Sequence, residues 1–163
     1  MNPDLLPAPP FPAARHWKIA ALWDYWIGVY ANVGHAPRRA DIDPVDIPRL
    51  LPNLWLADWD AASARFRYRL VGTGVTKARN IDATGHYLDE DFPDLAQSAL
   101  GRSLEGVVAS GRAAWSCALP PVTRTPNDIV RVERLSLPLS DGAGGVAMVL
   151  NLSVCTMRDG TTI

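Results

Sequence analysis

Apolar residues that alternate with small or polar ones fill the last third of the chain, and this pattern constrains the fold most. One such run covers residues 113–119 and ends at a Pro-Pro pair. Two longer runs cover 129–139 and 146–154, and the glycine-rich segment 141–145 joins them. Successive side chains of a strand point to opposite faces, so alternation predicts strands with one buried face. We therefore expect three antiparallel strands in this region.

Two more strand-like runs lie earlier in the chain, over 54–60 and 66–72. Between these two runs and the last three lies a stretch with helical signals. Apolar residues recur there at helical spacing over 95–108, and Gly111 follows as a stop. Helices segregated between groups of strands are typical of α+β domains. The order predicts a five-stranded antiparallel sheet with these helices packed on one face.

A further amphipathic helix is predicted ahead of the sheet, over 15–34. Apolar residues recur at three- and four-residue spacing from Ile19 to Val33, and Gly34 follows as a stop signal. The helix contains four large aromatic side chains: Trp17, Trp23, Trp26 and Tyr30. Side chains of this size must bury against something. Two interpretations stay open, namely packing on the chain's own sheet or an interface with a second copy or a partner.

The length of 163 residues fits one compact domain. We expect a flexible tail rich in proline and alanine over 1–14, the domain over 15–155, and a short C-terminal tail over 156–163. The 16 basic and 17 acidic side chains leave no positive surplus, and no basic patch is visible. Nucleic acid binding is therefore not expected, because it depends on neutralising many phosphates.

The compartment is predicted from the absence of targeting signals and from the cysteines. No apolar run approaches the roughly 20 residues that cross a bilayer, and no secretory signal is recognisable at the N-terminus. We therefore expect no membrane association and a cytoplasmic protein. Cys117 and Cys155 both lie in alternating apolar runs, which favours buried free thiols over a disulfide.

Four segments carry a family resemblance when they are taken in order: 43–53, 66–73, 84–90 and 132–140. They read Asp-Pro-Val-Asp-Ile-Pro-Arg-Leu-Leu-Pro-Asn, Phe-Arg-Tyr-Arg-Leu-Val-Gly-Thr, Thr-Gly-His-Tyr-Leu-Asp-Glu and Val-Glu-Arg-Leu-Ser-Leu-Pro-Leu-Ser. With these segments the chain resembles a PAS domain over about residues 15–155. More narrowly, it is similar to the single-domain bacterial PAS group in which a long N-terminal helix precedes the fold.

This resemblance implies a cavity between the sheet and the central helices that can hold a small molecule. It also implies signalling by dimerisation or by contact with a partner. Light-sensing members of the family hold flavin with a cysteine-containing motif on the central helix, and the corresponding stretch 74–81 has no cysteine. Haem-binding members need an axial histidine there, and only His86 lies near. We expect neither flavin nor haem, and the identity of any cofactor stays unknown.

Four side chains are our candidates to line or gate the cavity: Tyr68, Tyr87, Trp115 and Arg134. The alternative for each is a structural role, since aromatic side chains fill cores and arginines usually face solvent. The sequence shows no combination of a nucleophile, a base and an orienting group that would mark a catalytic site, so we do not expect an enzyme. The acidic clusters near Asp41 and Asp89 lack the glycine and spacing of a calcium loop, so no metal site is predicted.

The leading hypothesis is a stand-alone sensory or regulatory domain that binds a small molecule in its cavity. The alternative is a ligand-free protein–protein interaction module. The few residues after Cys155 are too short for an output domain, so we expect the signal to leave through a surface. We expect a homodimer and a separate signalling partner, with the aromatic helix as the interface through Trp17, Trp23, Trp26 and Tyr30.

Overall fold

The computed structural model of the protein describes residues 6–80, 82–119 and 128–163. Five strands form one antiparallel sheet in the order β2-β1-β5-β4-β3, which confirms the predicted α+β fold. The strands are β1 (Leu54–Asp60), β2 (Arg65–Val71), β3 (Ala114–Ala118), β4 (Ile129–Ser140) and β5 (Val146–Met157). The two longest strands, β4 and β5, are neighbours in this order and pair along most of their length.

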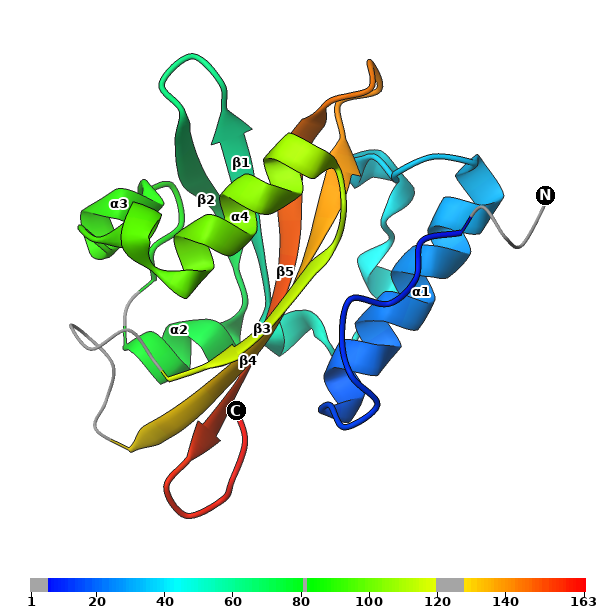
Figure 1. Ribbon diagram of the computed structural model, residues 1–163. Helices are drawn as coiled ribbons and strands as arrows, with labels where there is room; N and C mark the ends of the chain where they lie inside the picture. The colour runs from blue at the N-terminus through cyan, green and yellow to red at the C-terminus, as the bar shows by residue number, and fades with distance from the viewer. Residues whose placement is uncertain (1–5, 81, 120–127) are drawn as a thin grey trace.

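The helices divide between the two faces of the sheet, as Figure 1 shows. They are α1 (Trp17–Val33), α2 (Thr73–Arg79), α3 (Leu88–Asp91) and α4 (Ala99–Ser110). Four short 3-10 helices, η2 (Arg39–Asp41), η3 (Pro44–Asp46), η4 (Leu51–Asn53) and η5 (Leu95–Gln97), lie in the connections. The predicted insert, α2 to α4, covers one face, and α1 covers the opposite face.

Helix ends follow local capping signals. The Ser98 hydroxyl accepts a hydrogen bond from the Gly101 amide, and this cap begins α4 at Ala99. The helical period extends further back to Leu95, but Ser98 has extended backbone and separates η5 from α4. Gly111 ends α4 with a φ of 64°, a left-handed conformation that glycine adopts without strain.

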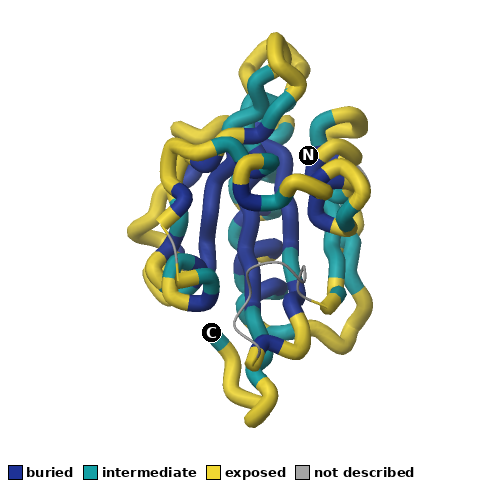
Figure 2. The backbone as a smooth tube through the Cα atoms, turned by 90° about the vertical axis from the view of Figure 1, so that its left-hand side faces the viewer, coloured by how far each residue is buried: buried dark blue, intermediate teal, exposed yellow. Residues whose placement is uncertain are grey.

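Helix α1 packs on the protein's own sheet. Trp23 and Trp26 are only 6% and 1% exposed, and Trp26 Nε1 donates to the Pro138 carbonyl at 3.3 Å. These two side chains join a core with leucines of β4 and β5 on one face of the sheet. Figure 2 shows the buried residues concentrated along the strands, between exposed loops. Of the two interpretations left open by the sequence, packing within one chain holds for these two tryptophans.

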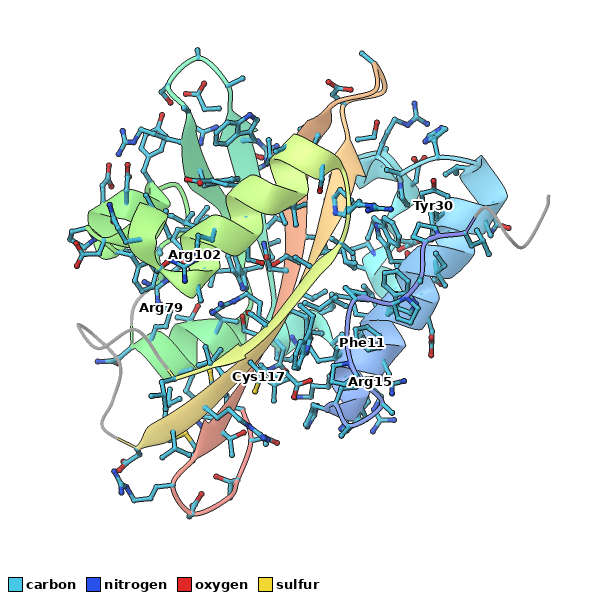
Figure 3. The ribbon with its side chains drawn as sticks, viewed as in Figure 1. Phe11, Arg15, Tyr30, Arg79, Arg102 and Cys117 are labelled. Atoms are coloured by element: carbon cyan, nitrogen blue, oxygen red, sulfur yellow. The ribbon has the colours of Figure 1, made fainter. Side chains whose placement is uncertain are left out.

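Both ends of the domain make contacts with it. In the N-terminal segment, Phe11 packs edge-on against Trp23 with ring centroids 5.9 Å apart, and Figure 3 shows it beside α1. At the other end, β5 continues to Met157, and the chain then turns back along it. Cys155 and Ile163 exchange two backbone hydrogen bonds of 3.0 and 2.9 Å, so the segment expected as a short tail folds against β5.

The prediction of two buried thiols is wrong for Cys117. This residue is exposed on β3, which is an edge strand, so alternation along β3 does not guarantee that both faces are covered. Cys155, on the more central β5, is partly buried. No helix in the described parts of the chain is long and apolar enough to cross a membrane.

Candidate functional site

A row of polar side chains crosses the face of the sheet that α2 and α4 cover. Ser116 of β3 pairs directly with Arg134 of β4, which pairs directly with Ser153 of β5. Directly paired residues of antiparallel strands project from the same face, so the three side chains form one line. In the neighbouring row, the buried Ser136 hydroxyl lies 2.6 Å from Asn151 Oδ1. The rest of this layer is largely apolar.

Arg134 is the most unusual member of this row. Its Nε donates to the Ser153 hydroxyl at 3.2 Å, and no described residue forms an ion pair with its guanidinium. Burial lowers the pKa of Arg134, and Arg79 lowers it further, whereas Cys155 and Tyr68 raise it. The side chain nevertheless retains accessible surface. Arg134 is therefore a largely enclosed cation without a carboxylate partner in the described part of the protein.

Ser153 is held in place by two donors. Its hydroxyl oxygen accepts from Trp55 Nε1 at 3.0 Å and from Arg134 Nε at 3.2 Å. Its backbone carbonyl accepts from the Asn53 side-chain amide at 2.9 Å. A hydroxyl oxygen has two lone pairs and one proton. Because both lone pairs are occupied, the Ser153 proton is left to donate.

A second guanidinium approaches the same region from α2. Arg79 donates to the Tyr68 hydroxyl at 2.7 Å and to Asp91 Oδ2 at 3.0 Å, and its guanidinium carbon lies 4.8 Å from the Phe92 ring centroid. Figure 3 shows Arg79 on the side of the sheet that carries α2 and α4. Asp91 is 6% exposed, so this ion pair is largely shielded from water. Arg79, unlike Arg134, is therefore neutralised by a carboxylate.

Tyr68 connects these groups to the sheet. Its ring packs on Trp55 with centroids 5.5 Å apart, and its hydroxyl accepts from Arg79. Burial raises the pKa of Tyr68, Arg79 and Arg134 lower it, and Asp91 raises it. We call Tyr68, Arg79, Arg134 and Ser153 the inner polar site. Counted over the described residues, two guanidiniums and the adjacent Asp91 carboxylate leave the site with one uncompensated positive charge.

Two of the four side chains predicted for the cavity, Tyr68 and Arg134, come together at the inner polar site. Tyr87 lies elsewhere. The guanidinium carbon of Arg65 lies 3.7 Å from its ring centroid, and Tyr87 lines a surface pocket with Asp58 and Arg67. Trp115 lies on the opposite face of the sheet, because it pairs directly with Leu135 of the α1-facing core. Its Nε1 donates to Glu133 at 3.2 Å rather than facing Arg134.

The four aromatic residues predicted for an interface also separate. Trp23 and Trp26 are buried in the core, whereas Tyr30 is partly exposed and Trp17 is 48% exposed. The Arg49 guanidinium lies 5.0 Å from the Trp17 ring centroid. Of the four aromatic side chains, only Trp17 and part of Tyr30 are therefore accessible for contact with another molecule.

Sequence reasoning missed Arg79, Asp91 and Ser153. Ser153 had a usable signal, because it alternates with Leu152 and Val154 and so shares a face with other polar residues of β5. Arg79 and Asp91 lie in short helices without clear periodicity, so no pattern pointed to them. His86 is exposed in a turn, where its carbonyl accepts from the Tyr68 amide at 2.9 Å. The described residues contain no group of three potential metal ligands.

Comparison with known families gives one finding. A family model described as a PAS domain matches residues 14–152, which is most of the chain. The match begins just before α1 and ends within β5, so it covers both layers of helices and every residue of the inner polar site except Ser153, which directly follows its last residue. A search of the curated proteins gives no match.

Proposed function

The chain belongs to the PAS domain family, whose members are sensory or regulatory domains, and from this premise we propose that it binds a small molecule at the inner polar site. The observation that supports this proposal best is Arg134. An enclosed charge without a partner costs stability, and proteins normally pair such a group. A bound molecule that accepts hydrogen bonds from the guanidinium would supply the missing partner.

Strand β4 also gives a route by which ligand binding at Arg134 can affect the surface of the protein. Glu133 and Arg134 are consecutive on β4, so their side chains point to opposite faces of the sheet. Glu133 is buried, and its carboxylate accepts hydrogen bonds from the His16 amide at 3.1 and 3.2 Å and from Trp115. A ligand that shifts β4 at Arg134 would therefore change the contact of Glu133 with the start of α1.

Helix α1 is the surface through which we expect the signal to leave. Its buried side is anchored to the sheet by Trp23 and Trp26, and its outer side presents Trp17 near Arg49. Exposed aromatic and arginine side chains are enriched at protein interfaces. This arrangement favours a homodimer or a partner protein that contacts the Trp17 end of α1. The same surface would serve a ligand-free interaction module, which is the second candidate function.

Native and denaturing mass spectrometry of the purified full chain test the proposal together. We expect the native spectrum to show a mass excess that disappears on denaturation, which would be the bound small molecule. The ligand-free alternative predicts a bare chain. A bare chain that also shows no change in melting temperature with a library of small metabolites would contradict ligand binding and favour the interaction module.

A further inference from the structure

We propose that the molecule held at the inner polar site is a small carboxylic acid, bound as its anion by Arg134. This inference rests on the proposed function and specifies its ligand class. It follows from three features of the site, which are the free donors, the local charge and the surrounding side chains.

The free donors match a carboxylate. A guanidinium offers five N–H groups, and Ser153 uses only the one on Nε. No described residue accepts a hydrogen bond from either terminal nitrogen of Arg134. Two parallel N–H groups fit the two oxygens of one carboxylate. The Ser153 proton, whose oxygen already accepts twice, is a further donor beside the same guanidinium.

The charge of the site fits one negative group. Asp91 compensates Arg79 at 3.0 Å, and Arg134 remains uncompensated among the described residues. Glu133 cannot serve, because it faces α1 on the other side of the sheet. A monoanion would bring the site to neutrality, whereas a cation would be repelled by both guanidiniums. A phosphate dianion would leave an excess negative charge.

The surroundings favour a ligand with an apolar body. Trp55 and Tyr68 pack together on the sheet, and both belong to an apolar cluster with Leu104 and Val107 of α4. These side chains are buried and carry few polar groups. An aliphatic or aromatic monocarboxylate would place its charged end at Arg134 and its body against this layer. A highly hydroxylated ligand would find fewer hydrogen-bond partners there.

The test compares charged ligands with neutral partners of the same shape. Benzoate and hexanoate are titrated into the full-length protein by calorimetry, beside benzamide and hexanamide, with phenylphosphonate as a dianion. We expect the carboxylates to bind and to raise the melting temperature, and the amides to bind at least tenfold more weakly. Equal binding of acid and amide, tighter binding of phenylphosphonate, or no carboxylate binding would overturn the inference.

Variants localise the binding to Arg134. Arg134→Met should weaken carboxylate binding at least tenfold, and Arg134→Lys should weaken it less. The matched control is Arg131→Met, which removes an exposed arginine of the same strand and should bind as the wild type does. Without ligand, Arg134→Met should melt no lower than the wild type, because it removes an enclosed charge that has no acidic partner among the described residues. Unchanged binding by Arg134→Met would overturn the assignment.

The outcome also separates this inference from the proposed function. A co-purified molecule that proves to be a carboxylic acid supports both. A co-purified neutral molecule, together with failure of the carboxylates, refutes the ligand class and leaves the sensory function in place. Absence of any bound molecule and of any response to small metabolites refutes both.

Discussion

At the scale of single residues, Arg134 and Glu133 of β4 make contacts on opposite faces of the sheet. Arg134 faces the helical insert with unused donors, and Glu133 faces α1 with its carboxylate fully engaged. The alternation of a strand puts these two adjacent charges on opposite faces of the sheet. The pair therefore links a candidate ligand site to the helix that carries the exposed Trp17.

A substitution of Glu133 tests whether this residue anchors α1 to the sheet. Glu133→Gln keeps the shape but places an amide donor where the His16 amide and Trp115 also donate. A buried group with a mismatched partner costs about 1–3 kcal/mol, so we expect the free energy of unfolding to fall by about that amount in urea titrations. Glu105→Gln, at an exposed position of α4, is the control and should change little. A variant as stable as the wild type would show that Glu133 does not anchor α1.

At the scale of elements, α1 depends on a neutral histidine. The Nδ1 atom of His16 accepts from the Lys18 amide at 3.2 Å, which it can do only when that nitrogen carries no proton. Burial lowers the pKa of His16, and Lys18 lowers it further, although Glu133 raises it. The cap is therefore an acid-sensitive point at the start of the helix.

The sign of this pH dependence follows from linkage. A folded pKa below the ordinary 6.5 means that the unfolded chain binds more protons, so the contribution is present above pH 6.5 and is lost as the pH falls below it. We expect the melting temperature to fall between pH 7 and pH 5, and His16→Asn, which caps without titrating, to reduce this fall. His35→Asn, at an exposed position, is the control. Equal pH profiles for wild type and His16→Asn would contradict the account.

The buried and the exposed tryptophans of α1 should respond differently to substitution. Trp26→Ala removes a side chain that is 1% exposed and should cost about 3–5 kcal/mol of stability, measured by urea unfolding. Trp17→Ala alters a 48% exposed side chain and should cost less than about 1 kcal/mol. If α1 forms the proposed dimer, light scattering should show Trp17→Ala as a folded monomer. A Trp17→Ala protein that remains dimeric would place the interface elsewhere.

At the scale of the whole molecule, the sequence predicts the fold well and the site only in part. Alternation and glycine stops mark all five strands, α1 and the end of α4, because these elements have one face buried and follow simple periods. The position of Trp115 relative to Arg134 depends instead on strand register, which places Trp115 opposite Leu135. Register is set by packing between distant segments, so no local pattern reveals it.

The helical insert limits site prediction for a different reason. The short helices α2 and α3 bring Arg79 and Asp91 together across a turn, and their positions depend on tertiary contacts rather than on periodicity. The PAS match extends through this insert and supports the fold assignment there. The charge balance of the inner polar site becomes visible only when the side chains are placed.

The central claim is that Arg134 holds a small molecule against the sheet. The most direct measurement is native mass spectrometry of wild type, Arg134→Met and Arg131→Met proteins purified in parallel. The account predicts the same mass excess on the wild type and Arg131→Met, and its loss from Arg134→Met while that variant remains folded. An equal mass excess on all three proteins would contradict it, because the bound molecule would then be held without Arg134.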